Sequence, residues 1–478
     1  MICAQANASP LHRACADLLV KLCVDALTET SYLAEVCELG SSIVSSDVGF
    51  RMRFNGFNDK LLDLFQTSMK IMLSFCGQVG SLPDTIGESR FSACLEVLQR
   101  RYKNSCMSAS DLSTNVRVRA LRPTIWSAQE RLESLRNIDV ASFTKTTSAI
   151  LGTMAVEAFF HGNADTADAE HAKELILNML NKSCKNGTCI GLPRKKYPAQ
   201  SVLQIPFPKA LKSDPTSTPS PWLITVPSKD PTEPNTAVEV YIQVGKDKLE
   251  DRVMIDLLVH MMDEPLYDHL RTREQLGYHV SIASRWTCGI TGLCVKIITA
   301  THASDVVLER VETFWRFWRQ ELETMSNADF VEHLSGLATQ KLDRFDGLSD
   351  ETDSLWEEIA DGRFEWQAWR DEAVVLRTIT KEQVVNAFDT WVQPADPKKR
   401  RILVVRVIAA PVAAATDENE DEDDSAADES TRVPQHASDG RPEIAFGDVG
   451  YYVDNQVSDF RKKVCKQQTW GRINSKLS

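Results

Sequence analysis

Two stretches of the chain repeat the same order of predicted elements, and this internal repeat constrains the fold more than any other feature. Each stretch reads as helix, Leu-Gly, strand, turn, strand, helix, with the Leu-Gly pair starting at Leu39 and at Leu276. A second landmark, a helix start followed by a strand, lies at nearly equal distances downstream, at Leu135 and Leu376. The repeat predicts an α+β protein with two related domains, each an open, mostly antiparallel sheet with helices packed on one face.

Composition divides the chain further. Residues 1–190 and 236–412 carry the helical and strand patterns of the two predicted domains. Residues 191–235 are rich in Pro, Ser and Lys, which predicts a linker with short extended segments. Residues 413–440 hold too little apolar surface to fold and predict an acidic, disordered loop. Residues 441–478 resume an amphipathic pattern and predict a C-terminal segment that docks as a helix.

Charge and cysteine usage exclude several classes of protein. The net charge is −13, but nine acids lie between Asp417 and Glu429, so the remainder is only mildly acidic and nucleic-acid binding is not expected. No apolar run is long enough to span a membrane. The first residues lack the continuous apolar core of a secretory signal, and the twelve cysteines include no CxxC pair. Reduced thiols in a cytoplasmic protein are the expected state.

The stretch "EPLYDHLRTREQLGYHV", from Glu264 to Val280, combines charged and aromatic residues with a terminal apolar strand. Pro265 suits the first turn of a helix, where its missing N–H costs little. Gly277 suits the left-handed position that ends a helix. We therefore expect a short helix that turns into a strand, with Leu266, Leu270 and Leu276 packed inside.

Helical spacing places Tyr267, Arg271 and Gln275 along one stripe of this helix, and Tyr278 continues the stripe at the corner. A guanidinium and phenol hydroxyls can donate hydrogen bonds to a peptide carbonyl or to a developing oxyanion. The alternative is a solvated helix face whose charges form ordinary surface ion pairs.

The same stretch resembles the fourth-domain motif of the insulysin and nardilysin family, written Arg-Thr-x-Glu-Gln-Leu-Gly-Tyr. The resemblance continues through "QKLDRFDGLSDETDSLWEEI" and "LRTITKEQVVNAF". In the first half, "SPLHRACADLLVKLCVDALTETSYLAEVCELG", "FNGFNDK" and "EAFFHGN" are similar to that family's third domain. The resemblance covers nearly the whole chain apart from the acidic segment. It identifies residues 1–190 as third-domain-like and residues 236–412 as fourth-domain-like.

The resemblance implies a fold and a mechanism. Members of this family of inverzincin metallopeptidases enclose a chamber between two halves, each built from two related α+β domains. Zinc lies in the first domain, within an inverted His-x-x-Glu-His motif. The fourth domain contributes an arginine and a tyrosine that hold the peptide substrate near the zinc. Arg271 and Tyr278 match those two positions, and the resemblance makes them the substrate-binding residues.

The zinc motif is absent from this sequence. Ala167 stands where the first histidine would precede His171, and Asp329 stands there before His333; HExxH is absent as well. Both histidines therefore read as helix surface residues. The chain is expected to bind no cofactor and to hold no catalytic residue, with zinc in a missing N-terminal half. A truncated product, a split subunit and an incomplete gene model are all consistent with this.

The expected function is the non-zinc, substrate-binding half of a zinc metalloendopeptidase that degrades peptides in an enclosed chamber. Its expected partners are the peptide substrate and a zinc-bearing N-terminal half or homologous subunit, and the chain alone is expected to be inactive. One alternative is a non-catalytic module that binds peptides or a partner and regulates an intact peptidase. Another is a structural subunit like the core proteins related to mitochondrial processing peptidase, which the retained Arg271 and Tyr278 disfavour.

Four further features are read as structural. Cys184 and Cys189 match no common redox spacing and are interpreted as loop thiols. The basic runs Pro193–Lys196 and Pro397–Arg401 read as solvated turns. His161 is interpreted as the end of a strand, and the acidic segment as a solvated tether.

Overall fold

The computed structural model describes residues 1–183, 201–207, 221–343, 345–396, 399–409, 449–464 and 469–471. They form two compact units that interleave in the sequence. The first unit comprises Met1–Ser105, Thr124–Ala199 and Gly347–Trp356, and the second comprises Cys106–Pro123, Gln200–Asp346 and Glu357–Ser478. Each unit combines an antiparallel or mostly antiparallel sheet with helices, so the predicted α+β class is confirmed.

The first unit is built on a small antiparallel sheet in the order β2-β3-β1-β4. Its strands are β1 (Ile2–Cys3), β2 (Gly40–Ser46), β3 (Gly49–Asn55) and β4 (Met154–Ala155). Its helices are α1 (Pro10–Ala26), α2 (Thr28–Val36), α3 (Asn58–Leu73), α4 (Glu88–Lys103), α6 (Ala128–Ser134), α7 (Val140–Leu151) and α8 (Thr166–Ser183).

Helix α1 forms the centre of the first unit's core. It begins where the Ser9 side chain accepts the N–H of His12 and Pro10 takes the first helical position. Its apolar residues recur at helical spacing and are buried against α4, α6 and α7. Phe143 of α7 packs edge-on against Phe75 and tilted against Phe91, which closes the core on that side.

The second unit contains a five-stranded sheet in the order β6-β10-β7-β9-β8. Its strands are β6 (Trp222–Pro227), β7 (Thr236–Lys246), β8 (His279–Thr287), β9 (Ile290–Thr299) and β10 (Ile402–Ile408). Neighbouring strands pair antiparallel except β10 and β6, which are parallel. A separate two-stranded ribbon joins β5 (Ser201–Leu203) to β11 (Thr469–Gly471).

Sheet topology confirms the predicted repeat. The first sheet has the order β2-β3-β1-β4, and four strands of the second have the order β8-β9-β7-β10. The strands β1, β2, β3 and β4 therefore occupy the same places in the first sheet as β7, β8, β9 and β10 in the second. Each set is a first strand, a hairpin of two strands and a fourth strand that returns to pair with the first. A helix follows each hairpin, α3 in the first repeat and α10 (Ser304–Thr324) in the second. The two domains are therefore related, as the matched landmarks predict.

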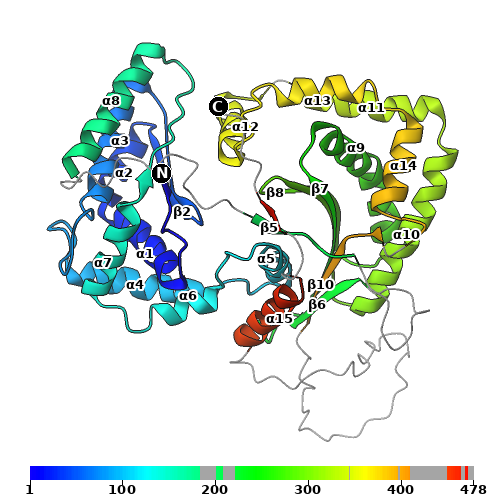
Figure 1. Cartoon of the computed structure of the whole chain (residues 1–478), viewed down its shortest axis with the longest axis horizontal. Helices are drawn as coiled ribbons and strands as arrows, with labels where there is room; N and C mark the ends of the chain where they lie inside the picture. The colour runs from blue at the N-terminus through cyan, green and yellow to red at the C-terminus, as the bar shows by residue number, and fades with distance from the viewer. Residues whose placement is uncertain are drawn as a thin grey trace, which may run out of the picture. The chain divides into compact units, whose positions relative to one another are not determined.

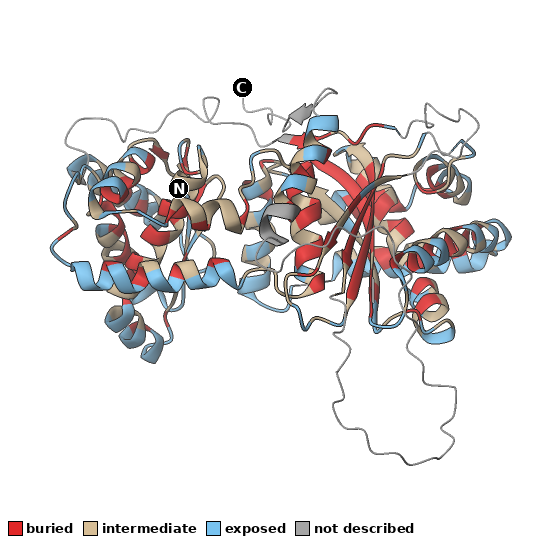
Figure 2. Cartoon of the chain, turned by 90° about the horizontal axis from the view of Figure 1, so that it is seen from below, coloured by how far each residue is buried: buried red, intermediate tan, exposed pale blue. Residues whose placement is uncertain are grey.

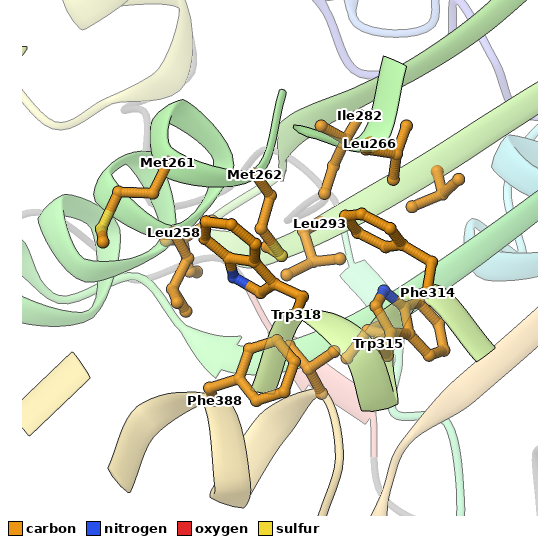
Figure 3. Packing of buried hydrophobic residues seen from close by; sticks show 14 of the residues in the cluster. Leu258, Met261, Met262, Leu266, Ile282, Leu293, Phe314, Trp315, Trp318 and Phe388 are labelled. Carbon is orange, nitrogen blue, oxygen red and sulfur yellow. The ribbon is translucent and has the colours of Figure 1, made fainter. Parts of the chain in front are cut away.

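One face of the second sheet is covered by helices that follow its strands. They are α9 (Leu249–Leu266), α10 and α14 (Lys381–Trp391), with α11 (Asn327–Leu342), α13 (Ala368–Leu376) and the end of α12 (Leu348–Asp361) beyond. Alternate residues of β7 point into this layer, and the central strands are almost wholly buried (Figure 2). Figure 3 shows Trp318 of α10 beside Leu258 and Met262 of α9, and Phe314 of α10 near Leu293 of β9.

The other face of the same sheet is covered by two helices from distant parts of the chain, α5 (Ala109–Leu121) and α15 (Val449–Val464) (Figure 1). The intervening residues of β7, such as Tyr241, point to this side and are buried with Val116 of α5 and Val457 of α15. The sequence predicts helices on one face, and the structure adds this second layer.

A buried ionic cluster fixes α5 to the sheet. Glu239 of β7 is only 1% exposed and accepts hydrogen bonds from the Arg117 Nε at 2.6 Å and the Thr114 hydroxyl at 2.6 Å. The Lys296 Nζ lies 3.1 Å from the same carboxylate. Burial by itself raises the pKa of Glu239, but the two cations and the hydroxyl outweigh it and lower that pKa below its ordinary value.

Within the described residues, none of the helices combines the length and apolar character that crossing a membrane requires.

Candidate functional site

The predicted site lies where α9 passes into a π-helix, η2 (Tyr267–Arg273), and then into β8. Pro265 lies inside this run, near the end of α9, and not in a first turn as the sequence predicts. A proline has no N–H to donate to the preceding turn, so it interrupts the α-helical hydrogen bonds at that point. The wider π turn follows directly, and the Glu274 N–H reaches the His269 carbonyl at 3.1 Å.

The end of η2 also differs from the prediction. Gln275, not Gly277, takes the left-handed conformation, with φ of 52°. The Leu276 N–H then closes the helix by donating to the Leu270 carbonyl at 2.9 Å. Gly277 serves a different purpose, because a Cβ built on it would lie 2.3 Å from the carbonyl oxygen of Ile298 in β9. The glycine allows the two backbones to approach where β8 begins to pair.

Three leucines hold η2 against the core. Leu266, Leu270 and Leu276 are fully buried in the cluster between the sheet and its helices, which confirms that part of the prediction. The corner that carries the candidate residues is therefore anchored from beneath by apolar packing.

Arg271 and Tyr278 are brought together at this corner. The Arg271 Nε donates to the Tyr278 carbonyl oxygen at 3.2 Å, which orients the guanidinium beside the first residues of β8. The Tyr278 side chain is 59% exposed and that of Tyr267 is 49% exposed. Neither phenol hydroxyl has a hydrogen-bond partner in the described part of the chain, so both can donate to a ligand.

Neighbouring charges are already paired. Glu274 lies 3.2 Å from the His269 Nε2 and 3.5 Å from the Arg310 Nε. Arg273 pairs with Asp268 at 2.5 Å. Arg271, by contrast, faces no carboxylate in the described ranges, and its terminal nitrogens keep their donors for an acceptor from outside. A guanidinium with free donors and an exposed phenol from the same corner can each donate to a carbonyl oxygen or an oxyanion.

The histidines found in partial motifs belong to other helices. His171 is exposed on α8, and the ring of His333 packs edge-on against that of His260, with 5.8 Å between centroids. The His161 Nδ1 contacts the Thr352 hydroxyl at 2.8 Å, and its ring stacks on Phe159. Across the residues that the structure describes, no three His, Cys, Asp or Glu side chains gather in a metal-binding group.

The remaining sequence candidates are either structural or outside the described residues. Arg400, in the second basic run, pairs with Glu312 at 2.5 Å and lies over the Trp315 ring. Arg401 lies over the Phe207 ring at 4.0 Å. Cys184, Cys189, the first basic run at 193–196 and the acidic segment 413–440 fall outside the described residues.

Sequence reasoning missed a cavity beside η2. It has a volume of about 290 Å³, and its lining includes acids from η2 and α10 together with aromatic side chains. The available signal was the spacing of Glu264 and Asp268, four residues apart on one helix face. Phe317 and Trp318 of α10 also line it, and only the fold brings these two segments together.

Two family models match this chain. One, described as the middle or third domain of peptidase M16, matches residues 1–134. The other, described as the C-terminal lobe domain 4 of a PQQ synthase PqqF-like protein, matches residues 257–356, which include η2 and the Arg271–Tyr278 corner.

Curated relatives match over most of the chain. A nardilysin-like protein of Arabidopsis thaliana is 26% identical over 81% of this chain, and the human insulin-degrading enzyme is 24% identical over 84%. Human nardilysin is 25% identical over 78%. The chain covers 36%, 37% and 30% of the length of these three proteins.

Solved structures share the fold. Pitrilysin superposes with a TM-score of 0.69 at 15% identity, over 87% of this chain and 40% of its own. A peptidase M16 inactive domain from Pseudomonas fluorescens superposes with a TM-score of 0.56 at 12% identity, over 86% of this chain and 92% of its own. The chain belongs to the M16 peptidases, and it corresponds to the C-terminal half of the insulysin and nardilysin type.

Proposed function

We propose that this chain is the substrate-binding half of a zinc metalloendopeptidase that degrades peptides, and that it works with a zinc-bearing half or homologous subunit. The observation that carries the proposal is the corner of η2 and β8, where the Arg271 Nε is fixed on the Tyr278 carbonyl and the Tyr278 phenol faces solvent. The proposal also places the protein in the cytoplasm, in keeping with the free cysteines among its described residues.

In this proposal the two side chains act on the scissile peptide. Arg271 keeps its terminal N–H groups free and binds a carbonyl oxygen of the substrate backbone, while Tyr278 donates its phenol proton to the oxygen on which charge develops. Zinc, which would activate water in such a peptidase, is expected to come from the other half. This chain's share of the chemistry is to hold and orient the peptide.

The test is a reconstituted enzyme. The chain, co-expressed with the zinc-bearing half of a nardilysin-type peptidase, is expected to cleave a fluorogenic peptide. Tyr278→Phe removes one donor and keeps the ring, so kcat should fall about 100-fold while KM changes little. Tyr32→Phe makes the same chemical change on an exposed tyrosine of α2, in the other unit, and should leave both constants unchanged. An unchanged kcat in the Tyr278→Phe enzyme would refute the role of the phenol.

A second candidate is a non-catalytic module that binds peptides or a partner and regulates an intact peptidase. It is favoured by the likeness to the Pseudomonas fluorescens structure, which is described as an inactive domain and has nearly the same extent as this chain. Under this alternative the chain binds the peptide, but no zinc-bearing half restores cleavage. Binding without cleavage in the reconstitution would therefore select the second candidate over the first.

A further inference from the structure

The outer side of strand β8 carries unpaired backbone groups. Among the described strands β8 pairs only with β9, so it forms one edge of the five-stranded sheet. The two strands are joined by a two-residue turn, which makes Thr287 and Ile290 a hydrogen-bonded pair. Backbone groups of successive residues point to opposite sides of a strand, so every second residue before Thr287 faces away from β9. The backbone groups that face outward, and that have no hydrogen-bond partner in the described part of the chain, belong to Val280, Ile282, Ser284 and Trp286.

Arg271 lies at one end of this outward row. The Tyr278 carbonyl belongs to the same row and accepts the Arg271 Nε at 3.2 Å. One outward carbonyl of the row is therefore already bound by a donor from outside the sheet. The terminal nitrogens of Arg271 keep their donors, so a chain that paired along β8 would reach a guanidinium at the end of the row.

The edge formed by β8 lacks the features that usually block a sheet edge. The strand is nine residues long, contains no proline and no lysine, and its only charged residue is Arg285. The strand at the opposite edge, β6, has six residues and ends in Pro227. A long edge without such protection is a place where another extended chain can add as a further strand.

A cavity of about 380 Å³ lies beside β8 and is lined by α9, β8 and α11; it is called the α9–α11 cavity below. Its apolar lining consists of Val259, Ile282 and Leu337. Lys341 also lines it, and its charge is compensated by Asp256 at 2.8 Å. The remaining lining residues are His260, Asp263 and Gln340. In a strand added to β8, the residue opposite Ile282 points its side chain to the same face of the sheet, where an apolar side chain meets this apolar lining.

We propose that the outer edge of β8 binds an extended peptide as an added strand, with one apolar side chain of the peptide in the α9–α11 cavity. Hydrogen bonds to the outward backbone groups supply affinity for any sequence, and the cavity selects one residue of the peptide. The inference deepens the proposed function, because the same peptide reaches Arg271. It requires neither zinc nor cleavage.

Hydrogen exchange of the full chain tests the pairing directly. The probe is the peptide acetyl-Thr-Ser-Thr-Leu-Thr-Ser-Thr-amide, whose leucine is to lie opposite Ile282. At about ten times its Kd, the peptide should slow exchange of the outward N–H groups of Val280, Ile282 and Ser284 about tenfold. The N–H groups of Ala283 and Arg285 face β9 and serve as internal controls, with unchanged exchange. Mass spectrometry with fragmentation of the labelled peptides resolves single residues.

Two altered peptides separate backbone pairing from side-chain burial. Their Kd values are measured by fluorescence anisotropy of fluorescein-labelled forms. A methyl group on the leucine nitrogen removes the N–H that faces β8 and keeps the side chain, and should weaken binding about tenfold or more. Replacing the leucine with alanine keeps the backbone and loses the apolar contact with the cavity, and should also weaken binding about tenfold.

Two protein variants test whether the effect is local to β8. Ser284→Pro removes one outward N–H, a change that a sheet edge tolerates, and should weaken binding about tenfold. Ser41→Pro makes the same change at an outward position of β2, the edge strand of the first unit, and should leave the Kd unchanged. Circular dichroism checks that both variants are folded.

The outcomes separate this inference from the proposed function, because all of these measurements use the chain without a zinc-bearing half. Failure of the reconstituted enzyme to cleave refutes the proposed function and leaves pairing along β8 untouched. The inference is overturned by binding without protection of the outward N–H groups, by equal Kd values for the leucine peptide and its N-methyl form, or by equal weakening in the two proline variants. It is also overturned if the leucine peptide does not bind at about 1 mM.

Discussion

At the scale of single residues, the two repeats make the turn before the Leu-Gly pair in the same way. Glu38 and Gln275 both take positive φ, 58° and 52°, and each stands two residues before the glycine of its Leu-Gly pair. A Cβ on Gly40 would lie 2.7 Å from the Asn55 side chain, and one on Gly277 would lie 2.3 Å from a backbone carbonyl. Gly277 therefore serves close approach of two backbones, whereas the near contact of Gly40 is the flexible end of a side chain. In both repeats an ordinary residue accepts the left-handed turn. Sequence alone favours the opposite assignment, because glycine is the usual left-handed residue.

Gly277→Ala tests this reading. The new methyl group meets the Ile298 carbonyl, a backbone atom that cannot rotate away, so β8 must shift from β9. We expect the free energy of unfolding to fall by about 1–3 kcal/mol, the usual cost of overpacking. Differential scanning calorimetry should show a lower Tm. Gly347→Ala, with nothing within 4 Å of its Cβ, should leave Tm nearly unchanged. Equal Tm values for the two variants would contradict the close-approach role.

At the scale of elements, the packing of α5 on the sheet depends on the carboxylate of Glu239, and the sequence does not reveal this contact. Glu239→Gln keeps the shape of the side chain but leaves Arg117 and Lys296 buried without their anion. We expect the free energy of unfolding to fall by about 3–5 kcal/mol, because one partner of a buried ion pair is removed. Chemical denaturation measures the change. Glu309→Gln, exposed on α10, is the matched control and should have little effect.

The carboxylate of Glu239 also makes the free energy of unfolding depend on pH in the acidic range. The pKa of Glu239 is lower in the folded protein than its ordinary 4.5, so the folded state binds this proton less tightly than the unfolded state. Its contribution is present above pH 4.5 and is lost as the pH falls through the folded-state pKa. The free energy of unfolding, measured by chemical denaturation at several pH values between 7 and 3, should therefore fall more steeply with falling pH for the native chain than for Glu239→Gln. Parallel curves would show that the cluster contributes nothing.

The elements that the sequence predicts are those with a local signal. The hairpins after Leu39 and Leu276 are visible from alternation and a turn, and the buried leucines of η2 from helical spacing. The π turn after Pro265 and the position of α5 are not visible. The first depends on how one missing N–H is accommodated. The second depends on Arg117 meeting Glu239 across more than a hundred residues, a pairing that no local pattern encodes.

The candidate site divides in the same way. Arg271 and Tyr278 come from one short stretch, so a motif can name them, and their contact through the Tyr278 carbonyl follows from the helix–strand corner. The cavity beside η2 needs Glu264 from α9 and Glu321 from α10, and only the packed helices bring these acids together.

At the scale of the whole molecule, buried thiols link folding to alkaline pH. Burial raises the pKa of Cys3 and of Cys15 in the first unit, and of Cys294 in the second, from 9.0 to about 12 in each case. The folded state therefore keeps these protons where the unfolded state loses them. Their contribution to stability is complete below pH 9.0 and is lost as the pH rises towards 12, by up to about 1.4 kcal/mol per pH unit for each thiol.

Two measurements check this expectation. Urea denaturation should give a lower free energy of unfolding at pH 10.5 than at pH 8, and Cys294→Ala should reduce that difference, whereas Cys37→Ser should not, because Cys37 is exposed. Iodoacetamide at pH 8, followed by peptide mass spectrometry, should modify Cys37 quickly and leave Cys3, Cys15 and Cys294 intact until denaturant is added. Rapid modification of Cys294 in the native chain would mean that the layer formed by α5 and α15 does not seal the sheet in solution.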